Sequence, residues 1–134
     1  MSIPSGLRQV VVQRAGRRCE YCLLSEEGQE ATFHIDHVVP TALGGPNTIG
    51  NLALACVSCS LRKGARVAVT DLLTGREVGL YNPRTDEWSQ HFRWNGVYIE
   101  PLSSVGRVTV EAMKMNRPLI LAIRLEEQSL GRSP

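Results

Sequence analysis

The sequence predicts a mixed α+β fold of short strands and helices that a structural zinc ion holds together. Two Cys-x-x-Cys pairs use all four cysteines of the chain, Cys19 with Cys22 and Cys56 with Cys59. A gap of two residues lets both thiolates of a pair reach one ion, and four thiolates make the closed tetrahedral site that suits structural Zn²⁺. Around these pairs, short alternating segments typical of strands mix with segments of helical period.

The first half of the chain is predicted to form helix, strand, loop and helix in that order. Residues 5–18 have an apolar face of helical spacing behind a serine that suits an N-cap. Residues 31–39 alternate as a strand does, with His34 and Asp36 on one face, and a proline ends the run. A loop rich in Gly, Pro and Asn, a short apolar segment and a basic helix follow at residues 41–50, 51–55 and 58–66.

The second half is predicted to form an appended layer of short strands and two helices. Its predicted elements are a hairpin over residues 67–81, strands over 92–94 and 97–99, a helix over 105–115 and a last helix beginning at Pro118. We find no internal repeat and no long linker, and 134 residues suit one domain with a moderate core. We therefore expect a single domain, 1–134, built from a zinc-bearing part, 1–66, and an extension, 67–134.

Composition favours an ordinary globular protein. The net charge of +2 predicts no strong overall field for nucleic acid, although basic residues cluster before the first cysteine pair and after the second. No apolar run approaches the roughly 20 residues that span a bilayer, and the N-terminus lacks the features of a signal peptide. We expect a cytoplasmic protein with no membrane partner, in which paired cysteines bind metal rather than form disulfides. A thioredoxin-like redox pair is the less favoured alternative.

The pair Asp36-His37 at the end of a predicted strand indicates a metal-assisted hydrolase. A carboxylate is the hard oxygen ligand that Mg²⁺ or Mn²⁺ prefers. A histidine titrates near pH ~6.5, so His37 can act as a general base for water at neutral pH. An ion on one side of a phosphate and a base on the other meet the needs of in-line attack by water. Neighbouring residues on a strand point to opposite faces, which fits this division of roles.

Five short motifs follow one another along the first half of the chain: Asp36-His37-Val38-Val39-Pro40, Gly44-Gly45, Asn51-Leu52, Cys56-Val57-Ser58-Cys59 and Lys63-Gly64. In the order and spacing of these motifs the chain resembles the HNH endonucleases, a family with a ββα-metal fold and four-cysteine zinc knuckles. The resemblance covers about residues 19–64, and residues 81–107 resemble the C-terminal extension of small stand-alone bacterial HNH proteins. It implies an α+β fold with a zinc-stapled ββα-metal core and a C-terminal layer of short strands and two helices.

The resemblance also implies roles for single residues. Asp36 would be a ligand of the catalytic divalent ion, His37 the general base, and Asn51 the residue that holds the loop bearing the base. The remaining signature position is normally Asn or His, a second metal ligand, but here it is Ser60. A neutral hydroxyl is a weak ligand, so we expect weak ion binding. His34 is a further candidate ligand, and its alternatives are a phosphate contact or a surface strand residue.

The sequence thus supports the hypothesis of an endonuclease that hydrolyses DNA phosphodiester bonds with Mg²⁺, or with Mn²⁺ or Ni²⁺. The expected partner is double-stranded DNA, bound largely without sequence preference. Arg62, Lys63 and Arg66 are the predicted backbone contacts, and idle solvated charge is their alternative. The rival hypotheses are a catalytically weak or inactive HNH fold that only binds nucleic acid, and a zinc-stabilised interaction module. Oligomeric state and biological pathway do not follow from the sequence.

Overall fold

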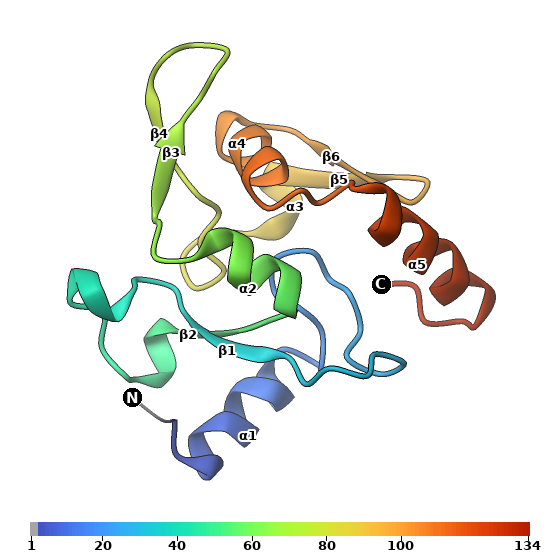
Figure 1. Ribbon diagram of the computed structural model, residues 1–134, viewed down its shortest axis with the longest axis horizontal. Helices are drawn as coiled ribbons and strands as arrows, with labels where there is room; N and C mark the ends of the chain where they lie inside the picture. Colours follow the sequence, from blue (N-terminus) through green and yellow to red (C-terminus); the bar gives the residue numbers. More distant parts are fainter. Residues whose placement is uncertain (1–2) are drawn as a thin grey trace.

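The structure, a computed structural model, describes residues 3–134. The first layer consists of α1 (Ser5–Arg14), β1 (His34–His37), β2 (Leu52–Ala55) and α2 (Val57–Lys63), shown in Figure 1. Strands β1 and β2 are antiparallel, with Ile35 opposite Leu54 and His37 opposite Leu52. Helix α2 begins shortly after β2 and packs against both strands, which produces the predicted strand, strand, helix order.

Burial explains why β2 lies at the centre of this layer. Its residues Leu52 and Leu54 and the alanine beside each are fully buried, with α1 on one side of the hairpin and α2 on the other (Figure 1). A strand covered on both faces is apolar throughout rather than alternating. Each buried leucine side chain contributes roughly 1.5–3 kcal/mol of transfer free energy to folding. This short apolar run therefore fixes the hairpin between the two helices.

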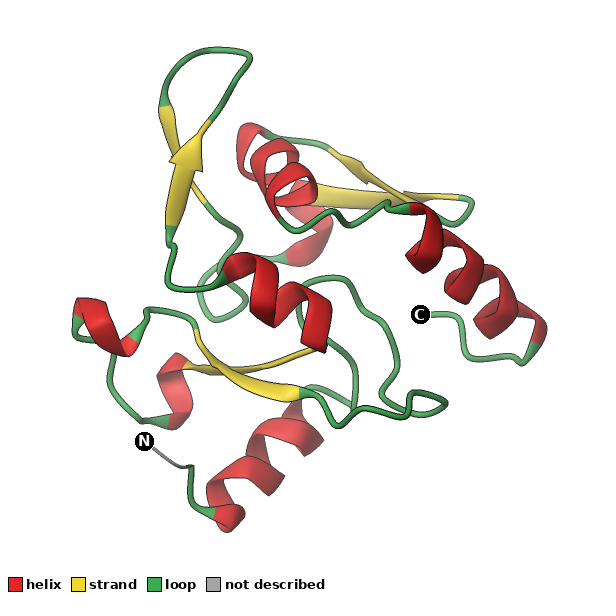
Figure 2. Ribbon diagram, in the orientation of Figure 1, coloured by secondary structure: helices red, strands yellow, loops and turns green. Residues whose placement is uncertain are grey.

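The second layer packs above α2 and contains two further hairpins and three helices (Figure 2). None of the helices in residues 3–134 is both long and apolar enough to cross a membrane. Helix α4 packs against both hairpins, which joins them into one unit. The elements are β3 (Ala68–Thr70), β4 (Glu77–Gly79), α3 (Trp88–His91), β5 (Phe92–Asn95), β6 (Tyr98–Pro101), α4 (Ser104–Ala112) and α5 (Pro118–Ser129).

The mixed α+β class is confirmed, while several predicted elements are shorter than expected. The first helix ends at Arg14 rather than at residue 18, because Gly16 and Arg17 have φ of +63° and +57°, outside the helical region. Helix α2 ends before Gly64, whose φ is +56°. Strand β1 covers four residues of the predicted range 31–39. Helix α3 was not predicted, because four residues are too few to show a helical period.

The two layers share one buried core. The indole Nε1 of Trp88 donates to the backbone oxygen of Tyr21 at 2.8 Å, and Arg84 makes an ion pair with Glu20. The ring of Tyr81 packs edge-on against that of Tyr21 with centroids 6.3 Å apart. Buried residues of both layers belong to a single cluster. That 1–134 form one domain stays a prediction, and residues 1 and 2 lie outside the described residues.

Candidate functional site

Four cysteine sulfur atoms meet where the first loop approaches the start of α2. Their Sγ atoms all lie within 4.8 Å of one another, and all four residues are buried and free of disulfides. In each pair the second backbone N–H points at the first sulfur, Cys22 to Cys19 at 3.5 Å and Cys59 to Cys56 at 3.4 Å. Zn–S bonds of about 2.3 Å in a tetrahedron separate the sulfurs by about 3.8 Å. The cluster therefore suggests a structural zinc site.

The protonation of these thiols also favours a cation at their centre. Hydrogen bonding with Cys19, and then with the other two thiols, lowers the pKa of Cys56. Burial raises the pKa of Cys19, and hydrogen bonding with Cys19 raises that of Cys59. Without a cation, the surroundings of Cys19 and Cys59 thus disfavour their thiolates. A divalent cation supplies the positive charge that four buried thiolates require.

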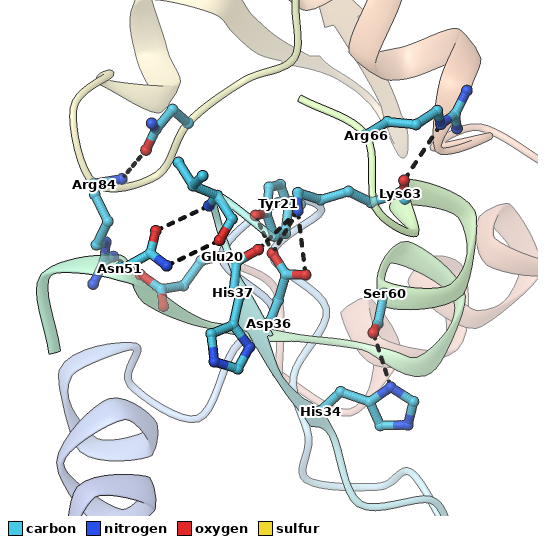
Figure 3. A network of polar contacts seen from close by, with 12 residues as sticks. Glu20, Tyr21, His34, Asp36, His37, Asn51, Ser60, Lys63, Arg66 and Arg84 are labelled. Atoms are coloured by element: carbon cyan, nitrogen blue, oxygen red, sulfur yellow. Dashed lines mark hydrogen bonds and ion pairs between the residues drawn. The ribbon is translucent and has the colours of Figure 1, made fainter. Parts of the chain in front are cut away.

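Both carboxylate oxygens of Asp36 are engaged by neighbouring side chains (Figure 3). The hydroxyl of Tyr21 donates to Oδ2 at 2.6 Å, and the ammonium of Lys63 lies 3.3 Å from Oδ1 and 3.2 Å from Oδ2. Burial and the nearby carboxylate raise the pKa of Tyr21 well above its ordinary value, so its hydroxyl remains a donor. The Asp36 and Lys63 side chains are only 8% and 2% exposed. Asp36 is thus an ordered, nearly buried carboxylate.

The contacts of Asp36 couple it to the cysteine cluster. Tyr21 lies between Cys19 and Cys22, and Lys63 lies one helical turn after Cys59. Both partners therefore come from segments that the sulfur cluster anchors. Removing one partner of a buried ion pair destabilises the fold by about 3–5 kcal/mol, because the other charge is left uncompensated. Order at the cysteine cluster and order at Asp36 consequently depend on each other.

His37 lies at the end of β1, where its side chain is half-buried. Its Nε2 is 3.0 Å from Oδ1 of Asn47, in the loop that follows the strand. An amide oxygen only accepts hydrogen bonds, so this contact favours the neutral tautomer with the proton on Nε2 and the lone pair on Nδ1. The arrangement therefore leaves Nδ1 as the basic nitrogen of His37.

Asn51 holds this loop together. Its Oδ1 accepts from the backbone N–H of Val39 at 2.9 Å, and its Nδ2 donates to the backbone oxygens of Val39 and Pro46 at 3.0 and 2.9 Å. Gly45 fits beside it because a Cβ there would lie 1.7 Å from the oxygen of Val39. The side chain of Asn51 is buried, so these three bonds replace those it would make with water. They fix the backbone just after His37.

Ser60 and His34 face each other between α2 and β1. Their Oγ and Nδ1 atoms are 2.9 Å apart. Ser60 also lines a shallow hollow with Asp36 and His37, so that the predicted oxygen ligands and the predicted base border one space. Within residues 3–134, however, the four cysteines are the only group of three or more His, Cys, Asp or Glu side chains whose donor atoms meet. His34 and Asp36 do not form such a group with a third side chain.

The three predicted DNA contacts differ in exposure. Arg62 and Arg66 are exposed on the last turn of α2 and just beyond it, and within residues 3–134 neither pairs with a carboxylate. The Arg62 Nε donates to the hydroxyl of Ser58, and the Arg66 Nε to the backbone oxygen of Lys63. Lys63 itself is 1% exposed and turned towards Asp36. That position does not suit a phosphate contact, because the phosphate backbone cannot reach a buried ammonium.

Sequence reasoning missed two side chains that shape this site and misjudged a third. Tyr21 and Asn47 were not considered, although they contact Asp36 and His37 directly. Lys63, a predicted contact with the DNA backbone, is buried instead. A local sequence pattern cannot show that Tyr21 and Lys63 contact Asp36, because they are 15 and 27 residues away from it along the chain. The only available signal was the position of Tyr21 between two cysteines, which places it near any metal they hold.

Comparison with known proteins gives one match, to a family model. Residues 19–66 match the family model described as HNH endonuclease. The matched segment contains both cysteine pairs, β1, β2 and α2. No curated protein and no solved structure matches the chain.

Proposed function

We propose that the protein hydrolyses DNA phosphodiester bonds with a divalent ion, starting from the match of residues 19–66 to the family model described as HNH endonuclease. That match implies a nuclease-type or nucleic-acid-interacting function, because this family generally hydrolyses nucleic acids. The observation that carries the finer proposal is the hollow that Asp36, His37 and Ser60 line together. It brings a carboxylate, a base and a hydroxyl to one accessible space.

Asp36, Ser60 and His34 are the residues that would hold the ion. Their carboxylate and hydroxyl oxygens are the hard donors that Mg²⁺ and Mn²⁺ prefer, and an imidazole adds affinity for Mn²⁺ or Ni²⁺. Asp36 and Ser60 border the same hollow, which fits an ion that keeps much of its water shell, and His34 Nδ1 lies 2.9 Å from Ser60 Oγ. When bound, the ion offsets negative charge on the phosphoryl oxygens and on the leaving group.

His37 is the proposed general base. Its Nδ1 accepts a proton from water while the water oxygen attacks phosphorus, and the bond from phosphorus to the 3′ oxygen breaks. The products are a 5′-phosphate and a 3′-hydroxyl whose proton comes from solvent. Asn47 keeps the proton on Nε2, and Asn51 holds the backbone after His37 in place. These residues position the base before substrate arrives.

Arg62 and Arg66 are the proposed contacts with the DNA backbone, and we leave the buried Lys63 out of this surface. We expect binding to fall steeply with salt, because each phosphate contact releases counterions and contributes about 0.9 to the log–log salt slope. Replacing both arginines by glutamine should lower the slope by about 2 in filter-binding or fluorescence titrations. The matched control is Arg93→Gln, an arginine of β5 already paired with Glu100 at 3.0 Å. An unchanged slope in the double variant would move the DNA surface elsewhere.

Ser60→Asn should strengthen the ion site and raise the nicking rate. An amide oxygen is a better ligand than a neutral hydroxyl and reaches further from the helix. We expect the wild-type protein to nick DNA slowly with Mg²⁺ and faster with Mn²⁺ or Ni²⁺. In the variant, the nicking rates with these ions should differ less. Titration calorimetry of the ion and single-turnover nicking on both proteins measure the effect. If Ser60→Asn binds the ion no more tightly and cuts no faster, serine is a competent ligand and this expectation fails.

Nicking of supercoiled plasmid separates the endonuclease from its rivals. Zinc-loaded protein is incubated with plasmid and Mg²⁺, Mn²⁺ or Ni²⁺, and a parallel reaction omits added divalent ion. Ion-dependent conversion to nicked or linear plasmid supports the proposal. Salt-sensitive binding without cleavage under any of these ions would favour the inactive nucleic-acid-binding module, for which Ser60 is the distinguishing residue. Absence of both binding and cleavage would favour the interaction module.

A further inference from the structure

Lys63 carries a buried positive charge that touches both proposed catalytic residues. Its Nζ lies 3.3 and 3.2 Å from the two carboxylate oxygens of Asp36 and 3.1 Å from the backbone oxygen of His37. The ammonium donates to Oδ1 of Asp36 and to the backbone oxygen of His37, and it forms an ion pair with the carboxylate. Figure 3 shows the Lys63 side chain reaching from α2 to the carboxylate of Asp36. Lys63 is therefore an internal cation that the carboxylate of Asp36 neutralises.

The same helix brings this ammonium and the proposed ligand Ser60 to Asp36. Lys63 follows Ser60 by three residues, a spacing that places two side chains on neighbouring parts of one helix face. The start of the helix is tied to the cysteine cluster through Cys56 and Cys59. Packing thus sets the position of Lys63, and its contact with Asp36 differs in this respect from an ion pair between two mobile side chains on the surface.

We propose that Lys63 is an internal counter-cation that competes with the divalent ion for the carboxylate of Asp36, an inference that rests on the proposed metal-dependent function. Tyr21 and Lys63 already contact the oxygens that an ion would need. A divalent ion at those oxygens repels the ammonium, and a nearly buried site screens that repulsion poorly. Ion binding therefore displaces Lys63 from Asp36. Before the ion binds, Tyr21 and Lys63 hold the carboxylate of Asp36 in place. Displacing Lys63 lowers the affinity of the site for the ion.

The first test measures Mn²⁺ affinity of the zinc-loaded full chain without DNA, by electron paramagnetic resonance of free Mn²⁺. Lys63→Met removes the charge and keeps the length of the side chain, and we expect it to bind Mn²⁺ at least tenfold more tightly. Lys63→Arg keeps the charge and should stay within threefold of wild type. Lys114→Met is the matched surface control. The double variant Asp36→Asn/Lys63→Met removes both buried charges and should lose the gain in affinity.

The second test uses the wild-type protein, so it holds even where Lys63→Met does not fold. The chain has two lysines, Lys63 and the exposed Lys114. An acylating reagent should label Lys114 readily and Lys63 slowly, and saturating Mn²⁺ should raise labelling of Lys63 at least fivefold without changing Lys114. Mass spectrometry of peptides reads both sites in one sample. In the Asp36→Asn variant, Mn²⁺ should have no such effect.

Two outcomes would overturn the inference. One is a Lys63→Met protein that binds Mn²⁺ no more tightly than wild type, and the other is Mn²⁺ binding to wild type that leaves the labelling of Lys63 unchanged. Either result would mean that the ion pair of Lys63 and Asp36 has only a structural role. These readouts are independent of the plasmid assay. Tighter Mn²⁺ binding by Lys63→Met in a protein that never cuts DNA would refute the endonuclease and keep the counter-cation.

Discussion

Cys22→Ser is expected to yield a chain that does not fold stably and that holds zinc poorly. Metal binding to a site of this kind supplies ~10 kcal/mol or more of folding free energy, whereas a whole domain is stable by only about 5–15 kcal/mol. Losing one of four thiolates also releases Tyr21, whose hydroxyl donates to Asp36. Soluble yield, zinc content by elemental analysis and thermal melts followed by circular dichroism measure the effect.

The matched control for this variant is Leu72→Ser, a polar substitution at a side chain that is 89% exposed, which should melt like wild type. Cys59→Ser tests the second cysteine pair and should behave like Cys22→Ser. A zinc chelator applied to wild type should lower its melting temperature as the substitutions do. Stoichiometric disulfides, or metal-free protein that melts as the zinc-loaded protein does, would refute a structural zinc site.

His37→Ala should abolish plasmid nicking while leaving the fold and the DNA affinity close to wild type. A positioned general base contributes ~10²–10⁴-fold to the rate. The side chain is half-buried, and its one side-chain hydrogen bond is to Asn47 in a loop, so its removal leaves the core intact. Single-turnover nicking, DNA titration and a thermal melt on the same preparation separate the chemical step from binding and folding.

Two further variants test whether this loss belongs to His37 itself. His91→Ala changes a histidine of α3 that contacts Ser103 at 2.6 Å, and it should keep nicking activity. Asn47→Ala removes the partner of Nε2 and should lower the rate less than His37→Ala does, because the base remains but its tautomer is no longer fixed. Cutting by His37→Ala at the wild-type rate would show that another group is the base.

The local elements near the cysteine pairs could be predicted because their signals are local. A two-residue gap between cysteines, a run of four buried apolar residues at β2 and the turn residues of the later hairpins each act within a few positions. Element ends were less predictable. Arg17 adopts a φ of +57°, which no propensity of arginine indicates, so the first helix stops earlier than its apolar pattern suggests.

The identity of the donor groups can be read from the sequence alone: four cysteines in two pairs, and Asp36 next to His37. The partners of those groups follow only from the packing of distant segments. Lys63 and Asp36 are 27 residues apart. A lysine on an exposed face of α2 would be free to contact DNA, whereas Lys63 is buried and pairs with Asp36. Spacing along the chain fixes only neighbours within a turn of helix or strand. Contacts between distant segments depend on how β1 and α2 pack, and that packing decides which charges meet.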